Sequence, residues 1–219
     1  MVLIPTKHMK AMLLNGVFDL TKGQSPLSLH EIDIPQPETD EVLIKVKACG
    51  VCHTEIDEIE GRLIPPAYPV IPGHQVTGEV VSDSPVNKNI KRGDSVGVAW
   101  IYHACGKCHW CLSGYENLCP SFKATGRDVN GGYAEYIKAK ADFVYKIPDN
   151  ISDMEASFTE PAACCLRAVK RANVKLGDNV LIIGLGSIGL IMGQIAKHFG
   201  ANVTGCDLLD ERIELAKEL

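Results

Sequence analysis

The segment 179-NVLIIGLGSIGLIMGQIA-196 contains four glycines and no charged residue. Residues 180–184 are a short apolar run rich in β-branched side chains, and from Leu185 onward the apolar residues recur at helical spacing. An uncharged segment of this length could also cross a membrane. The glycines and the change of period instead favour a strand, a tight turn and a helix in a soluble domain.

Within this segment, Gly184-x-Gly186-x-x-Gly189 follows the predicted strand and opens the predicted helix, which extends to Phe199. Glycines at this spacing let the backbone turn tightly and approach a pyrophosphate, which the helix N-terminus attracts. A second strand is predicted over residues 201–207, and Asp207 ends it. An acid at this position can accept hydrogen bonds from ribose hydroxyls and repels a 2′-phosphate, so NAD is favoured over NADP. A simple strand-end turn is the alternative interpretation of Asp207.

The first part of the chain has a different residue pattern. Short β-branched runs separated by turn residues predict strands and a barrel-like all-β domain; the runs are 43–49, 77–83, 94–100, 131–139 and 142–150. The pattern Ser152-x-x-Glu155 is typical of a helix start. The fold class is therefore α/β, with a β-rich domain over 1–155, then a linking helix and the first part of a doubly wound (Rossmann) domain over 156–219.

Composition narrows the class of partner. The net charge is −5 and basic residues do not cluster, which argues against nucleic acid and membrane surfaces. Nine cysteines without an export signal indicate a reducing, cytoplasmic compartment. Four of the nine are expected to be small core residues, namely Cys49, Cys164, Cys165 and Cys206.

Four further cysteines lie in 105-CGKCHWCLSGYENLC-119. The spacing of Cys105, Cys108, Cys111 and Cys119 allows four thiolates to converge on one tetrahedral ion and leaves no open position for a substrate. The segment predicts a structural zinc loop. An iron–sulfur cluster and disulfides are the alternatives.

A second cluster combines Cys52, from 49-CGVCHTE-55, with His74, from 72-PGH-74, and with Glu160. One thiolate, one imidazole and one carboxylate, with a fourth position open, describe a catalytic zinc site. The Cys-x-x-Cys at Cys49 and Cys52 could instead be a redox pair, but the sequence does not indicate the strand–helix setting that such pairs use.

These motifs, in this order and spacing, resemble the zinc-dependent medium-chain alcohol dehydrogenase family from about Met9 onward. The resemblance implies a GroES-like first domain and two zinc ions. It also implies a role for each matching residue: Cys52, His74 and Glu160 as catalytic zinc ligands, Thr54 as proton relay, His53 near the cofactor pyrophosphate, Glu55 behind the zinc histidine, and Trp100 in the substrate pocket wall. Two positions depart from the family: Gln75 replaces a glutamate and Asp57 replaces a histidine.

The resemblance implies hydride transfer between NAD and an alcohol or its aldehyde or ketone, in a homo-oligomer when the protein is complete. The Glu160-Pro161 pair resembles the polyol-dehydrogenase branch, so polyol or amino-alcohol oxidation is an alternative. A non-catalytic zinc-binding fragment is another. The particular alcohol is not identified.

A doubly wound domain needs about six parallel strands, and two are predicted here. We therefore expect the 219 residues to belong to a longer polypeptide, or their tail to be covered by another chain or poorly ordered. Uncovered faces are expected at Val180, Ile182, Ile183 and Val203. Alone, the chain is expected to bind zinc, to bind NAD weakly or not at all, and to turn over little substrate.

Overall fold

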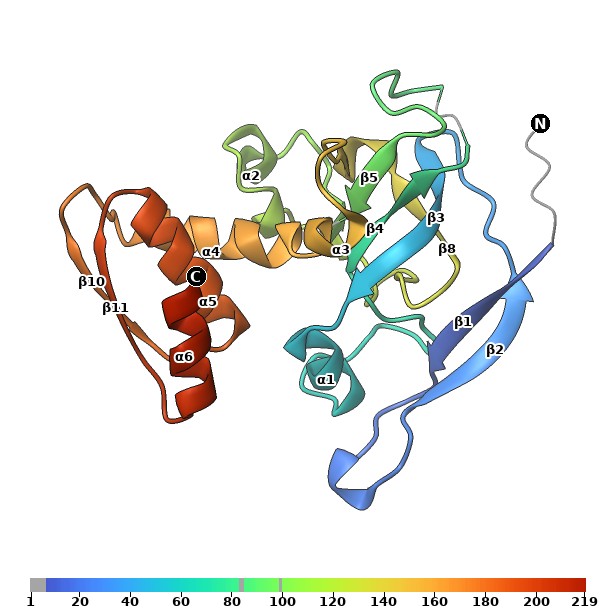
Figure 1. Cartoon of the computed structure of the whole chain (residues 1–219). Helices are drawn as coiled ribbons and strands as arrows, with labels where there is room; N and C mark the ends of the chain where they lie inside the picture. The colour runs from blue at the N-terminus through green and yellow to red at the C-terminus, as the bar shows by residue number, and fades with distance from the viewer. Residues whose placement is uncertain (1–6, 83–84, 99) are drawn as a thin grey trace. The chain divides into compact units, whose positions relative to one another are not determined.

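The computed structural model describes residues 7–82, 85–98 and 100–219. The chain forms two compact units, Met1–Phe158 and Thr159–Leu219, and each is described by itself (Figure 1). The domain boundary predicted between residues 155 and 156 stays a prediction. Among the described residues, no helix is both long and apolar enough to span a bilayer.

A five-stranded antiparallel sheet forms the centre of the first unit, in the order β8-β3-β4-β5-β9 (Figure 1). Its strands are β3 (Glu41–Gly50), β4 (Gln75–Val80), β5 (Ser95–Val98), β8 (Tyr136–Lys140) and β9 (Val144–Lys146). Alternate residues such as Val42, Ile44 and Val96 are completely buried in one cluster. The β-rich first domain predicted from the sequence is confirmed, although the strand ends differ by a few residues.

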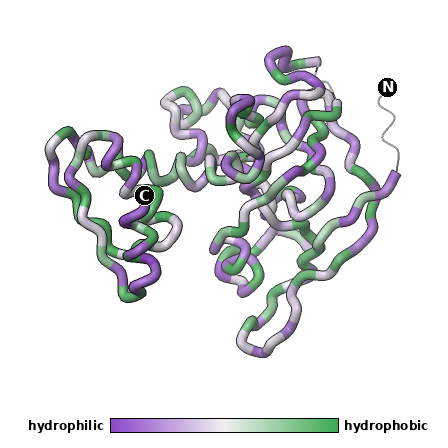
Figure 2. Tube along the Cα trace, in the orientation of Figure 1, coloured by the Kyte–Doolittle hydropathy of each residue, from purple (hydrophilic) through white to green (hydrophobic). Residues whose placement is uncertain are grey.

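The sequence analysis missed the hairpin of β1 (His8–Leu14) and β2 (Leu27–Asp33). Both strands mix hydrophobic and hydrophilic residues (Figure 2), and the two kinds alternate over residues 8–11, as expected of a strand with one covered face. Met9 and Ala11 are buried in a second cluster. Two short strands, β6 (Ile101–His103) and β7 (Lys123–Ala124), pair on either side of the cysteine loop.

The helical elements of the first unit are short: η1 (Leu20–Lys22), α1 (His53–Ile59), α2 (His109–Leu112), η2 (Glu116–Leu118), η3 (Ala141–Phe143) and α3 (Asp153–Ala156). The predicted capping box at α3 is confirmed. The Glu155 amide donates to Ser152 Oγ at 3.3 Å, and the Ser152 amide donates to Glu155 Oε2 at 2.9 Å.

The second unit contains α4 (Thr159–Arg171), β10 (Asn179–Ile183), α5 (Ser187–His198), β11 (Asn202–Cys206) and α6 (Asp210–Glu218). The strands β10 and β11 are parallel, with Val180 beside Val203, and α5 packs against both of them. This is the strand–turn–helix–strand arrangement predicted for the start of a Rossmann domain. The helix begins two residues later than predicted because Gly186 is its N-cap.

Two expectations about burial need correction. Ile182 is only 8% exposed, because it faces the packed side of β10, and Val180 and Val203 are partly buried against the apolar cluster of this unit. Ile183 points the other way and is 81% exposed, as predicted. Cys164 and Cys206 are exposed and are not core residues. Cys165 is buried, and Cys49 packs partly buried against the sheet core.

Candidate metal centres and dinucleotide loop

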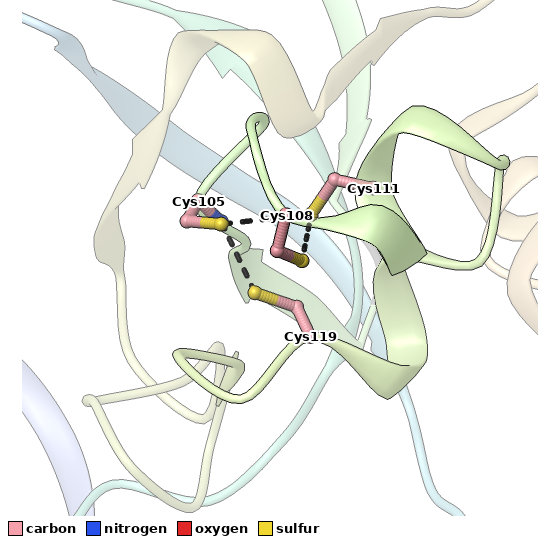
Figure 3. A group of neighbouring side chains, drawn as sticks. All are labelled: Cys105, Cys108, Cys111 and Cys119. Atoms are coloured by element: carbon pink, nitrogen blue, oxygen red, sulfur yellow. Dashed lines mark hydrogen bonds between the residues drawn. The ribbon is translucent and has the colours of Figure 1, made fainter.

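The four loop cysteines converge at one point (Figure 3). Their sulfur atoms all lie within 4.8 Å of one another, and all four are free thiols. The helix α2 begins directly after Cys108, so Cys108 and Cys111 lie on one tight turn, with their sulfur atoms 3.5 Å apart. Four sulfur atoms at this separation fit the shell of a tetrahedral zinc ion.

Hydrogen bonds distinguish the thiols of this loop. Backbone N–H groups of Lys107 and Cys108 lower the pKa of Cys105 to about 6, whereas burial raises that of Cys111 to about 12. The Cys119 sulfur accepts hydrogen bonds from the amides of Cys105 at 3.3 Å and Ser121 at 3.4 Å. The backbone therefore favours a negatively charged sulfur at Cys105.

Cys52 and His74 come from separate elements of the first unit. Cys52 is the N-cap of α1, and His74 directly precedes β4. Glu55, on the first turn of α1, joins them: one carboxylate oxygen accepts from the Cys52 amide at 2.7 Å, and the other lies 2.8 Å from His74 Nδ1. Both Glu55 and His74 are about 97% buried.

This arrangement suits a metal ion. A hydrogen bond from Nδ1–H to Glu55 leaves Nε2 as the ring nitrogen with the lone pair, which is the usual orientation of a metal-binding histidine. A hydrogen bond with His74 lowers the pKa of the Cys52 thiol, against the opposing effect of burial. A thiol that ionises easily beside a lone-pair nitrogen provides two of the ligands that zinc prefers.

The predicted proton relay and pocket wall lie beside these groups. Thr54 Oγ1 is 3.5 Å from Cys52 Sγ. The Trp100 ring meets the His74 ring edge-on, with centroids 4.9 Å apart. His53 is largely exposed, and its Nε2 lies 3.7 Å from Asp57. Asp57 also accepts a hydrogen bond from Arg62 at 2.5 Å, so the acid at this departing position is held in a local ion pair.

Three glycines position the backbone before His74. Gly73 has a φ of +97°, a conformation that side chains disfavour. A Cβ on Gly131 would lie 2.1 Å from the Gly73 oxygen, and a Cβ on Gly126 would lie 2.9 Å from the Gly73 nitrogen. The chain therefore meets itself backbone to backbone directly before His74, where there is no room for side chains.

The structure corrects the prediction that the Cys-x-x-Cys segment lacks a strand–helix setting. The strand–helix setting is present, because Cys49 lies in β3 and Cys52 caps α1. Burial raises the pKa of Cys49 to about 12, and both thiols are free. A thiol so reluctant to ionise is a poor partner for thiol–disulfide exchange, which favours the metal site over the redox pair.

In the second unit, the glycine loop has the conformation that its spacing predicts. Gly184 has a φ of +93°, and a Cβ on Gly189 would lie 1.9 Å from the Gly184 oxygen. A Cβ on Gly186 would have no atom within 4 Å, and Gly186 is the N-cap of α5. The loop can therefore bring its backbone close to a pyrophosphate, as a dinucleotide fingerprint requires.

Asp207 follows β11 and holds this loop. Its carboxylate accepts hydrogen bonds from the amides of Leu185 at 2.7 Å and Leu209 at 3.0 Å, and these lower its pKa. Arg212 Nη1, which the sequence analysis did not consider, lies 3.4 Å away. Asp207 is thus an ionised group at the loop, with a cation beside it.

Three further residues bear on the predicted sites. Glu160, the predicted third catalytic ligand, lies in the first turn of α4, and its role stays a prediction. Glu58 and Arg127 were not predicted. Glu58 interacts electrostatically with Cys52 and His74, and Arg127 lies 5.8 Å from the centroid of the Trp100 ring. Glu58 could have been found from its spacing, since it lies three residues after Glu55 and so on the same face of α1.

The comparisons with known proteins agree with this architecture. Residues 38–149 match the family described as the alcohol dehydrogenase GroES-like domain, and the chain belongs to that family. An alcohol dehydrogenase of Geobacillus stearothermophilus is 44% identical over 90% of this chain and 59% of its own length. A D-arabitol-phosphate dehydrogenase of Enterococcus avium is 35% identical over 94% of this chain and 59% of its own.

Among solved structures, a zinc-binding dehydrogenase from Sinorhizobium meliloti bound to NADP is similar, with a TM-score of 0.88 and 33% identity. The match covers 97% of this chain and 60% of that one. The chain therefore spans about 59% of the length of the curated relatives described above.

Proposed function

We propose that this chain carries the zinc-binding part and the first nucleotide-binding elements of an NAD-dependent alcohol dehydrogenase. The observation that carries this proposal is the buried Cys52–His74–Glu55 arrangement, in which one carboxylate orients an imidazole beside a readily ionised thiol. Its support is the match to the alcohol dehydrogenase GroES-like family. The reaction is hydride transfer between an alcohol and its aldehyde or ketone.

Two zinc ions are proposed for each chain. Cys105, Cys108, Cys111 and Cys119 would hold a structural ion, and Cys52 and His74 a catalytic ion together with Glu160. A catalytic zinc ion, when bound, supplies Lewis-acid polarisation of a substrate oxygen. Glu55 orients His74 through Nδ1. The hydroxyl of Thr54, 3.5 Å from the Cys52 sulfur, is the group that passes the substrate proton outward.

NAD is the proposed acceptor of the hydride, and the nicotinamide supplies that redox chemistry when bound. Gly184, Gly186 and Gly189 would admit the pyrophosphate at the start of α5, and His53 would approach it. The Asp207 carboxylate would accept hydrogen bonds from the ribose and disfavour a 2′-phosphate. Arg212 is the cation that could moderate this preference. Asp207→Gly is expected to shift the ratio of NAD to NADP affinity toward NADP, and tighter NADP binding by the unmodified chain would contradict the assignment.

The function is tested by mixing the chain with zinc, NAD and a panel of short alcohols and polyols, and following NADH absorbance. Because the chain spans only part of its relatives' length, even a low rate is informative if Cys52→Ser abolishes it. Substrate-dependent NADH formation that is equal in the wild type and in Cys52→Ser would exclude the proposed centre.

Polyol oxidation is the second candidate. It is favoured by the acidic residue at Glu160, directly before Pro161, and by the similarity to a D-arabitol-phosphate dehydrogenase. Faster NADH formation with polyols or their phosphates than with simple alcohols of equal length would select it.

A further inference from the structure

Three glutamate side chains are buried in the part of the first unit that the structure describes, and they differ in their partners. Glu41 is 1% exposed, accepts a hydrogen bond from the Tyr102 hydroxyl and lies 3.0 Å from Lys138 Nζ. Glu55 binds the Cys52 amide and His74. Glu58 is also 1% exposed, yet neither of its carboxylate oxygens has a hydrogen-bond partner.

Glu58 lies on the same face of α1 as Glu55, one turn further along. That face looks toward His74, since Glu55 reaches the His74 ring from it. The Glu58 carboxyl group interacts electrostatically with Cys52, His74 and Arg127. The helix therefore presents a second buried carboxyl group on the face that carries Glu55.

The surroundings of Glu58 contain other polar atoms in need of partners. The buried hydroxyl groups of Tyr68 and Tyr133 also lack hydrogen bonds, and both interact electrostatically with Glu58. Arg127, the nearby cation, is already paired with Asp128 at 2.6 Å. Burial, reinforced by Glu55, raises the pKa of Glu58 to about 8. An unpaired buried carboxylate is costly, whereas one beside a divalent cation is stabilised.

We propose that Glu58 is a positioning residue of the Cys52–His74 metal site, whose carboxylate supplies negative charge that holds the divalent ion. This inference rests on the catalytic metal site proposed above. At this site, β4 offers the uncharged Gln75 directly after His74, so the extra charge comes from α1. The contact is electrostatic or through water, and Glu58 need not bind the ion directly.

The test compares Glu58→Gln with Glu41→Gln in the full chain. Both variants replace one buried carboxyl group of the same unit and keep the side-chain shape. Affinity for Zn²⁺ and Co²⁺ is measured by competition with a chelator. The two sites are told apart by the sulfur-to-cobalt charge-transfer band, which is stronger with four thiolates than with one. Glu58→Gln is expected to weaken the Cys52 site by about 10- to 100-fold and to leave the four-cysteine site unchanged. Glu41→Gln should alter neither affinity.

Thermal unfolding of the metal-free chain gives a second readout. Glu58→Gln should unfold at the same or a higher temperature than the wild type, because the Glu58 carboxyl group has no hydrogen bond to lose and its raised pKa costs stability at neutral pH. Glu41→Gln should unfold at a lower temperature, because its carboxylate has partners to lose. An unchanged affinity in Glu58→Gln, or a fall in unfolding temperature matching that of Glu41→Gln, would overturn the role of Glu58.

The same measurements separate this inference from the proposed function. If the wild type binds a single metal ion and Cys52→Ser binds the same number, the catalytic site itself is wrong and the role of Glu58 falls with it. If the wild type binds two ions, Cys52→Ser binds one, and Glu58→Gln retains both with wild-type affinity, only the role of Glu58 is wrong.

Discussion

The four-cysteine loop and the Cys52–His74 site both use sulfur to hold a proposed zinc ion, but their surroundings differ. In the loop, the sulfur atoms contact one another and backbone amides within one short segment. In the other site, ligands from distant segments are joined by a buried carboxylate. The first arrangement fills every coordination position from its own chain segment. The second relies on Glu55, a group outside the proposed ligand set, to hold His74 in place.

The largest expected difference is in stability. Cys111→Ser opens the four-sulfur shell and should lower the free energy of unfolding by about 4 kcal/mol or more, because loss of a structural metal is among the most destabilising changes. Cys52→Ser should cost about 1 kcal/mol and remove only the second ion. Denaturant unfolding and elemental analysis of both variants measure this. The opposite ranking would mean that the roles of the two sites are exchanged.

A smaller effect, on metal affinity, is expected from Glu55. This buried carboxylate orients His74 and has no counterpart in the four-cysteine loop. Glu55→Gln keeps the shape of the side chain but weakens the hydrogen bond that orients His74. Affinity at the Cys52 site should fall by about 10- to 100-fold, and the loop should retain its ion. The control is Glu155→Gln, which alters a capping glutamate of similar hydrogen bonding on α3. If both variants lower metal affinity equally, the loss in Glu55→Gln comes from weaker helix capping and not from the orientation of His74.

The smallest effect concerns the thiols once both ions are removed. Each region pairs an easily ionised cysteine with a resistant one: Cys105 with Cys111, and Cys52 with Cys49. Lowered pKa values keep more thiolate on Cys105 and Cys52 near neutral pH, whereas Cys111 and Cys49, both with a pKa of about 12, stay protonated. Alkylation by iodoacetamide should therefore be faster at Cys105 and Cys52.

Peptide mapping by mass spectrometry follows each cysteine separately. Up to pH 9, Cys105 and Cys52 should remain the faster member of each pair, because the pKa values of Cys111 and Cys49, about 12, lie far above that pH. The exposed Cys164 provides an internal reference for reagent activity. Equal rates at Cys49 and Cys52 in the folded, metal-free chain would show that burial does not protect Cys49.

Local spacing was sufficient to predict several features. The four-cysteine loop, the glycine loop and the capping box at Ser152 each lie within one short segment, so their geometry follows from neighbours in sequence. The hairpin of β1 and β2 was missed because its strands are held by pairing with each other, and Glu58 because its burial depends on packing over α1. The Cys-x-x-Cys setting was misjudged because α1 is a short helix of seven residues, whose start depends on Glu55 reaching back to Cys52.

The packing of Gly73, Gly126 and Gly131 has a consequence for protein engineering. The Cβ positions of Gly126 and Gly131 would fall against the Gly73 backbone, so this contact depends on main-chain atoms and not on matched side chains. Segments carrying these glycines can therefore be exchanged between related sequences without redesigning the contact. A library that randomises any one of the three would instead lose most of its members to steric conflict before substrate preference could be selected.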